Sequence, residues 1–150
     1  MKLFRTDHDR QPYAIIIGGN KMGYALAEAL SDKGFLITVI GKETDSYEVA
    51  ATSRTMSALR GDATDEAVLR QAGIDKAGTV FVMTDSDNDN MMIAQFVRQK
   101  YPNQKLLARL NDPQKEVAYR AFAIQTVFPE AFFAKEIYDS FGTWMTEEQQ

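Results

Sequence analysis

The stretch Tyr13-Ala-Ile-Ile-Ile-Gly-Gly-Asn-Lys-Met-Gly23 decides the fold of this chain, because an apolar strand there runs into a glycine-bearing turn and then a helix. A strand that ends at Gly18, with Gly23 five residues further on, has the layout of a dinucleotide-binding βαβ unit. Gly18 has no Cβ, so the backbone can turn tightly and a phosphate can approach, while Gly23 lets the helix pack close to the strand. The helix N-terminus then offers N–H groups and the positive end of its dipole to the phosphate.

The glycine pattern is incomplete, because Asn20 stands where G-x-G-x-x-G has its second glycine. Asparagine tolerates a left-handed backbone better than most residues, so we expect the turn to survive. Its side chain nevertheless occupies space that a pyrophosphate would use. The turn by itself therefore leaves two interpretations open, nucleotide binding or a helix that only packs tightly against a strand.

Composition limits the classes of protein to which the chain can belong. Its 150 residues, 45% of them hydrophobic, suit one globular domain with a full core. A net charge of −4 without a basic cluster disfavours binding to nucleic acid. The chain has no cysteine, which excludes thiolate metal sites and disulfides and fits a reducing compartment. With no apolar run near the ~20 residues that span a bilayer and no signal-peptide core, we expect a cytoplasmic protein.

Apolar β-type runs alternate with helical patterns along the whole chain, which predicts an α/β fold. After a polar arm at 1–12, the predicted strands lie near 13–18, 35–40, 55–59, 79–84, 105–109 and 124–128. The predicted helices lie near 22–33, 45–52, 64–72, 88–100, 113–122 and 130–142, with 13–142 forming one domain and 143–150 a tail. We expect a Rossmann-like, doubly wound parallel sheet of order 3-2-1-4-5-6, with helices on both faces. In that order the ligand crevice lies beside Gly18 and Thr84, at the carboxyl ends of strands 1 and 4.

Several short motifs together resemble one family. They are Ile15-Ile-Ile-Gly-Gly-Asn-Lys-Met-Gly23, Val39-Ile-Gly-Lys42, Gly61-Asp-Ala-Thr-Asp65, Ala72-Gly-Ile-Asp-Lys-Ala77, Val82-Met-Thr84 and Ala108-Arg-Leu-Asn111. The succession resembles the TrkA-N domain, also called the N-terminal RCK or KTN domain, over roughly residues 13 to 141. The resemblance implies a cytosolic, non-catalytic regulator of a potassium channel or transporter, peripheral to the inner face of the membrane. It also implies an adenine nucleotide, NAD(H), ATP, ADP or AMP, and assembly as dimers or larger rings.

The resemblance carries over to particular residues unevenly. Gly18, Gly19 and Gly23 match the phosphate turn, which also holds Asn20 and Met22, and Lys21 stands where the family commonly has a basic residue. The loop after strand 3 flanks the adenine and holds Asp62 and Ala63, although Asp62 and Thr64 can equally only cap the helix that follows. Thr84, Asp85 and Arg109 end strands 4 and 5 at the crevice, where the alternative for Arg109 is a simple pair with an aspartate.

The end of strand 2 departs from the usual pattern. There the fold normally presents an acid that binds the ribose hydroxyls, but this chain has Gly41, followed by Lys42 and Glu43. A Gly-Lys pair removes the anion that repels a 2′-phosphate and supplies a cation, which makes NADP(H) a candidate ligand. The sequence therefore leaves open an adenine nucleotide, NADP(H), or no physiological nucleotide.

The run Asp85-Ser-Asp-Asn-Asp-Asn90 has the rhythm of a calcium loop. It lacks the glycine at position 6 and an acid at position 12, where Phe96 stands, so we expect it to cap a helix and bind no metal.

An unusually wide apolar band follows the last predicted helix and continues a few residues past its predicted end, and it is made of Phe133, Ala134, Ile137, Tyr138, Phe141, Trp144 and Met145. A band of this width suggests a homo-oligomer interface along 130–145, and the alternative is a helix folded onto its own sheet.

A regulatory, nucleotide-binding module of a potassium transport system is therefore the function that the sequence favours. A small NADP-dependent reductase is the rival enzyme class. It is disfavoured because all six βα units are used by the cofactor fold, leaving no substrate domain. A protein-binding scaffold without a nucleotide is the third possibility.

Overall fold

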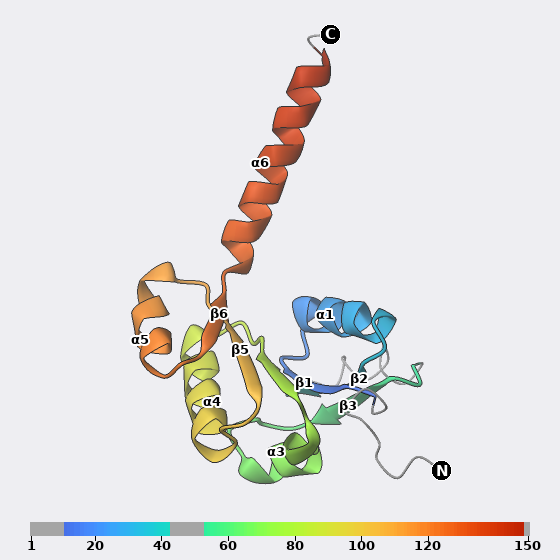
Figure 1. Ribbon diagram of the computed structural model, residues 1–150, viewed down its shortest axis with the longest axis vertical. Coiled ribbons are helices and arrows are strands. Elements are labelled where there is room, and N and C mark those ends of the chain that lie inside the picture. Colours follow the sequence, from blue (N-terminus) through green and yellow to red (C-terminus); the bar gives the residue numbers. More distant parts are fainter. Residues whose placement is uncertain (1–10, 43–52, 149–150) are drawn as a thin grey trace, which may run out of the picture.

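The computed structural model describes residues 11–42 and 53–148. Within them, six parallel strands form one sheet in the order β3-β2-β1-β4-β5-β6 (Figure 1). The strands are β1 (Tyr13–Ile17), β2 (Leu36–Gly41), β3 (Met56–Arg60), β4 (Thr79–Val82), β5 (Lys105–Arg109) and β6 (Gln125–Val127). The helices are α1 (Lys21–Asp32), α3 (Glu66–Gln71), η3 (Ile74–Lys76), α4 (Asp87–Lys100), η4 (Pro113–Lys115), α5 (Glu116–Ala121) and α6 (Pro129–Glu148). The predicted fold class and strand order are confirmed.

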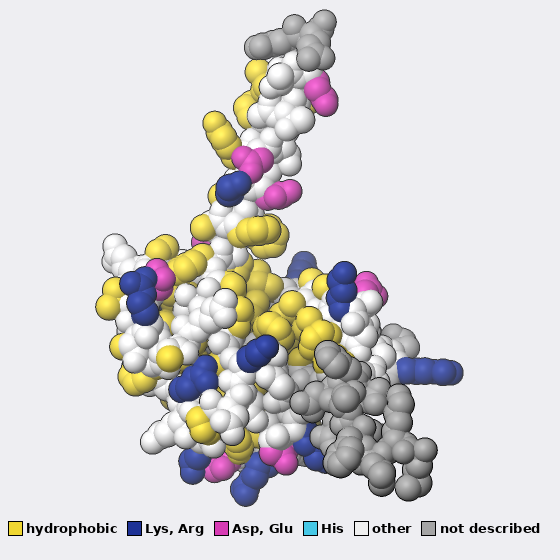
Figure 2. All heavy atoms as spheres, in the orientation of Figure 1, with side chains coloured by type: hydrophobic (Ala, Val, Ile, Leu, Met, Phe, Trp, Pro, Cys, Tyr) yellow, Lys and Arg dark blue, Asp and Glu magenta, His cyan; other side chains and the backbone are white. Residues whose placement is uncertain are grey.

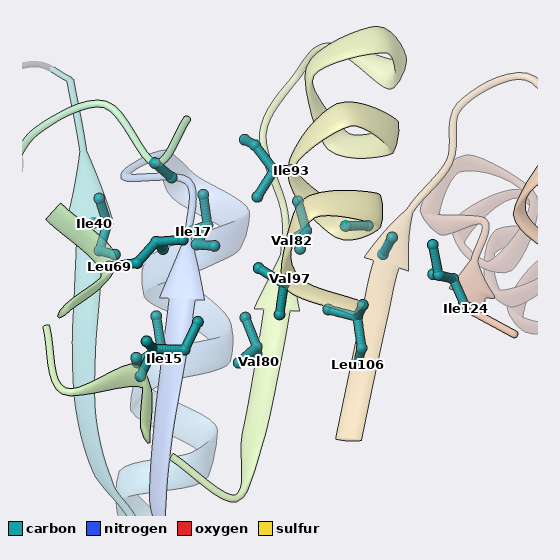
Figure 3. Packing of buried hydrophobic residues seen from close by; sticks show 14 of the residues in the cluster. Ile15, Ile17, Ile40, Leu69, Val80, Val82, Ile93, Val97, Leu106 and Ile124 are labelled. Atoms are coloured by element: carbon teal, nitrogen blue, oxygen red, sulfur yellow. The ribbon is translucent and has the colours of Figure 1, made fainter. Parts of the chain in front are cut away.

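One face of the sheet carries the larger part of the core. Branched aliphatic side chains from β1, β2, β4 and β5 pack there against α3 and α4 (Figure 3). Such side chains fit a pleated surface that is covered by helices. The fully or nearly fully buried members include Ile15, Ile17, Ile40, Leu69, Val80, Val82, Ile93, Val97 and Leu106. This packing fixes the strands whose carboxyl ends meet at one edge.

The other face is covered by α1, and its core is smaller. Ile16, Ala27, Ile37, Val39 and Met83 are buried there. On the same face, Phe81 of β4 and Leu107 of β5 pack against this cluster but are only partly buried. Strands β4 and β5 are therefore covered less completely on the α1 side than on the α3–α4 side.

The predicted elements differ from the observed ones mainly at their ends. The helix predicted near 64–72 begins at Glu66, and the helix predicted at 113–122 is divided into η4 and α5. Strands 4 and 6 are shorter than predicted. The helix predicted at 45–52 and most of the arm at 1–12 lie outside the described residues.

The last helix, α6, is longer than predicted and stands away from the sheet (Figure 1). The prediction ended it at 142 and made 143–150 a tail, but α6 is 20 residues long and runs through Gly142 to Glu148. A Cβ at Gly142 would meet no atom within 4 Å, because nothing packs there. The alternative of a helix folded onto its own sheet is therefore wrong.

Large apolar side chains lie exposed on α6, as yellow spheres on the projecting helix in Figure 2 indicate. They are Phe132, Phe133, Ile137, Tyr138, Phe141, Trp144 and Met145. The rings of Phe141 and Trp144 contact each other edge to face, with centroids 5.9 Å apart. Among the described helices none is long and apolar enough to cross a membrane.

Candidate functional site

An open cleft of about 240 Å³ lies at the carboxyl ends of β1, β2, β3 and β4. In a doubly wound sheet this edge is where ligands bind, because the connections on either side of the first strand leave in opposite directions. The cleft is lined by Ile17, Gly18, Gly19, Asn20, Ile40, Gly41, Lys42, Gly61, Asp62, Ala63, Thr64, Thr84, Asp85, Asp89 and Ile93.

The turn after β1 needs both of its outer glycines. Gly18 has φ +132°, a backbone conformation that residues with a side chain rarely adopt, and a Cβ there would lie 2.6 Å from the carbonyl oxygen of Met83. A Cβ at Gly23 would lie 2.0 Å from the carbonyl oxygen of Gly18. Gly23 therefore allows the predicted close packing of α1. The close approach at Gly18 that the structure shows is to the backbone of Met83 and Thr84, just after β4, whereas the sequence analysis expected an approach by a phosphate.

Asn20 does not adopt the left-handed backbone that the sequence led us to expect. Its φ of −116° and ψ of 178° are extended, and it is the N-cap of α1. Its Oδ1 accepts the N–H of Gly23 at 2.8 Å, and its Nδ2 donates to the carbonyl oxygen of Met83 at 2.8 Å. An asparagine that replaces a glycine here thus links the turn to β4 and satisfies one N–H of the first turn of the helix.

Lys42 and Asp62 face each other across the rim between β2 and β3. Their Nζ and Oδ2 atoms are 3.7 Å apart, with side chains 62% and 49% exposed. Asp62 Oδ1 accepts the backbone N–H of Thr64 at 2.9 Å and its hydroxyl at 2.7 Å. These hydrogen bonds hold the pKa of the Asp62 carboxyl below its usual range, with Lys42 adding a smaller effect. Neither Asp62 nor Thr64 caps α3, since the N-cap is Asp65.

A second hollow adjoins the cleft on its β5 side. It is lined by Asn20, Lys21, Met22, Asp85 and Arg109, so Asn20 and Asp85 belong to both. The side chain of Arg109 is only 13% exposed, and its Nη1 lies 3.2 Å from Asp85 Oδ1. The predicted alternative of an Arg109–aspartate pair is therefore present, and it borders the hollow. Together the cleft and the hollow form a path from β3 to β5 across the glycine turn.

Asn90 holds Thr84 in place and was missed by the sequence analysis as a positioning residue. It is fully buried, and its Nδ2 donates to the carbonyl oxygens of Thr84 and Arg109 at 3.0 and 3.1 Å. Its Oδ1 accepts the N–H of Thr84 at 3.0 Å. The sole local signal was an asparagine in the first turn of a predicted helix, and its partner on β5 lies nineteen positions away.

Asp87, on the same helical turn, fastens the loop after β5. Its two carboxylate oxygens accept the N–H groups of Asn111 and Asp112 at 2.7 and 2.9 Å. Its own carbonyl oxygen accepts the hydroxyl of Tyr119 at 2.9 Å, and burial raises the pKa of Tyr119 to about 12. The run that resembled a calcium loop is thus the N-cap, Ser86, and the first turn of α4. In the part of the chain that the structure describes, no three acidic or histidine side chains are grouped to hold a metal.

The structure brings most of the predicted site residues together. Gly18, Gly19, Asn20, Gly41, Lys42, Asp62, Ala63, Thr84 and Asp85 line the cleft, and Lys21, Met22 and Arg109 line the adjoining hollow. Gly23 is buried beneath the turn and lines neither. The lining also includes Ile93 and Asp89 of α4, which the sequence analysis did not select.

Comparison with known proteins agrees with this geometry. Residues 14–129 match the model of the TrkA-N domain family. The Trk system potassium uptake protein TrkA of Streptomyces coelicolor is 30% identical over 115 residues, which cover 77% of this chain and 52% of that protein. This chain therefore spans about half the length of the curated relatives it matches.

Two solved structures share the fold. The Kef C-terminal domain of Shewanella denitrificans, in its AMP-bound form, superposes with a TM-score of 0.78 at 19% identity, covering 89% of this chain and 81% of that one. GsuK bound to ADP superposes with a TM-score of 0.73 at 25% identity, covering 86% of this chain and 33% of that one. The family match covers the glycine turn and most of the six-stranded sheet. The chain therefore belongs to the TrkA-N domain family.

Proposed function

We propose that this domain is a nucleotide-binding regulatory module of a potassium transport system and that it catalyses no reaction. The observation that carries the proposal is the cleft at the carboxyl ends of β1 to β4, bounded by the glycine turn and the start of α1. Membership of the TrkA-N family supports it, as does the similarity to a potassium uptake protein. The AMP and ADP in the two neighbouring structures support an adenine nucleotide as the ligand.

In this proposal the adenosine lies between Gly41 and Asp62, and its phosphates lie over Gly18 to Gly23. Ala63, which is 4% exposed and lines the cleft, gives the base a small apolar neighbour. The first turn of α1 supplies N–H groups that have no acceptor within the helix, and Lys21 adds a positive charge beside them. For a dinucleotide, the second nucleoside extends into the hollow bordered by Arg109.

The proposed output is a change in the geometry of an oligomer that contacts a membrane partner. The exposed apolar band of α6 supports a homo-oligomer, because an unburied surface of this kind is unfavourable in water. An apolar groove of about 570 Å³ at the base of α6 adds to this surface. It is lined by Met22, Thr126, Val127, Phe128, Pro129, Ala131, Phe132, Phe133 and Lys135. Met22 borders both this groove and the hollow at the start of α1, so a ligand there touches a residue of the surface that we assign to the oligomer.

Titration calorimetry with ADP, joined to sedimentation velocity with and without ADP, tests the proposal. The Lys21→Gln substitution should weaken ADP binding by roughly tenfold, the scale of one charge-assisted hydrogen bond, and leave adenosine binding unchanged. The matched control is Lys33→Gln, which removes the same charge at the C-cap of α1, and it should bind ADP as the parent does. Absence of ADP binding would refute the nucleotide role. Binding without any change in sedimentation would refute the proposed output.

A further inference from the structure

The rim between β2 and β3 has a charge pattern unlike that of a site for an unsubstituted ribose. A carboxylate at the end of the second strand normally accepts hydrogen bonds from the two ribose hydroxyls. The corresponding position here is Gly41, which lines the cleft and has no side chain. The acid at this rim is instead Asp62, which follows β3.

The carboxylate of Asp62 is largely occupied by its own loop. Its Oδ1 already accepts the N–H and the hydroxyl of Thr64, while Oδ2 lies 3.7 Å from Lys42 Nζ. The carboxylate thus retains hydrogen-bond donors whether or not Lys42 stays beside it. An exposed ion pair at this distance contributes little, so Lys42 can turn to another anion at small cost.

A second cation lies at the same edge of the sheet. Arg60 is the last residue of β3, it is exposed, and the strand register pairs it with Gly41. The N–H of Gly61, the next residue, donates to the carbonyl oxygen of Gly41 at 2.9 Å. Lys42 follows Gly41 in the chain and lines the cleft, whereas Arg60 pairs with Gly41 from the neighbouring strand, at the outer edge of the lining.

The geometry points to a nucleotide that carries a phosphate on the 2′ oxygen of its adenosine ribose, as NADP(H) does, recognised by Lys42 and Arg60. Among the residues that the structure describes at this rim, two cations and one carboxylate leave a net positive charge for a phosphate dianion. This inference rests on the proposed function, because it assumes that the adenosine lies between β2 and β3. It adds which chemical group on that adenosine is selected.

Three commercial mononucleotides test the inference by calorimetry on the full chain, freed of bound nucleotide. They are 5′-AMP, adenosine 2′,5′-bisphosphate and adenosine 3′,5′-bisphosphate, and the first two differ only in the 2′-phosphate. The 2′,5′-bisphosphate should bind roughly 10- to 100-fold more tightly than 5′-AMP, the range of one hydrogen bond between charged groups. That preference should fall as ionic strength rises, because both cations are exposed.

Single substitutions then assign the preference to residues. Lys42→Gln and Arg60→Gln should each lower the ratio of the two affinities, 2′,5′-bisphosphate over 5′-AMP, by roughly tenfold, which is the readout that assigns the preference. The control Lys105→Gln removes the same charge at the start of β5, the opposite end of the sheet, and should keep the preference. Thermal unfolding of each variant separates a lost contact from a damaged fold.

The inference is overturned if the chain binds 5′-AMP and the 2′,5′-bisphosphate equally, or if the 3′,5′-bisphosphate binds more tightly. It is also overturned if Lys42→Gln weakens all three ligands alike. In each of these cases 5′-AMP still binds and the proposed function survives. If none of the three binds, the proposed function fails together with the inference.

Discussion

Replacing Asn90 with leucine should lower the free energy of unfolding by about 3 kcal/mol. Leucine has a similar volume but offers no hydrogen bond, so the N–H of Thr84 and the carbonyl oxygens of Thr84 and Arg109 lose their partner. At roughly 1 kcal/mol for each of these partly buried groups, the sum is a large part of the stability of a typical domain. For a chain of this size the melting temperature should fall by roughly 6 to 12 °C.

Urea denaturation at fixed protein concentration measures this loss, with Asn88→Leu as the control. Asn88 lies two positions earlier on α4 and is exposed, so its replacement should change stability by less than about 0.5 kcal/mol. Because Thr84 lines the cleft, Asn90→Leu should also weaken ADP binding at a temperature where the variant is still folded. Equal losses for the two variants would refute the reasoning that Asn90 holds β4 to β5.

Two further predictions concern the surface and the pH dependence of stability. Substituting both Phe141 and Trp144 with serine should shift sedimentation toward the monomer without lowering the melting temperature of the sheet. The control Val117→Ser, at a still more exposed apolar residue of α5, should leave sedimentation unchanged. An unmodified chain that sediments as a monomer at high concentration would contradict this prediction. Tyr119 has a pKa of about 12 in the folded chain and about 10 when unfolded, so its contribution is present below pH 10 and is lost as the pH rises from 10 to 12. Tyr119→Phe should therefore reduce the alkaline loss of urea stability between pH 9 and pH 11, and an unchanged loss would exclude Tyr119 as its source.

The fold was predictable because its signals are local and repeated. An apolar strand runs into Gly18 and Gly23 within eleven residues, and further apolar runs alternate with helical patterns along the rest of the chain. Regular alternation of strands and helices then allows few sheet orders, because parallel crossovers are right-handed. The positions of most cleft residues follow from that order, since the carboxyl ends of parallel strands meet at one edge.

The sequence could not predict contacts between distant residues. Lys42 meets Asp62 only because β2 and β3 are neighbours, and twenty positions separate them. The sequence analysis considered Asn20 only as a replacement for a glycine. It therefore missed that the Asn20 side chain accepts the N–H of Gly23 and caps α1. The extension of α6 was missed because Gly142, a weak helix former, lies at the predicted end. In the structure α6 continues beyond Gly142 through residues 143–148.

The projecting helix α6 acts geometrically as a lever. Its 20 residues span about 30 Å at 1.5 Å each, and it leaves the sheet at a single joint between Phe128 and Pro129. A rotation of about 10° at that joint displaces the far end by about 5 Å, which is close to one helical turn. The same rotation moves Trp144, which lies closer to the joint, by about 4 Å, most of the distance between neighbouring side chains of a packed partner helix.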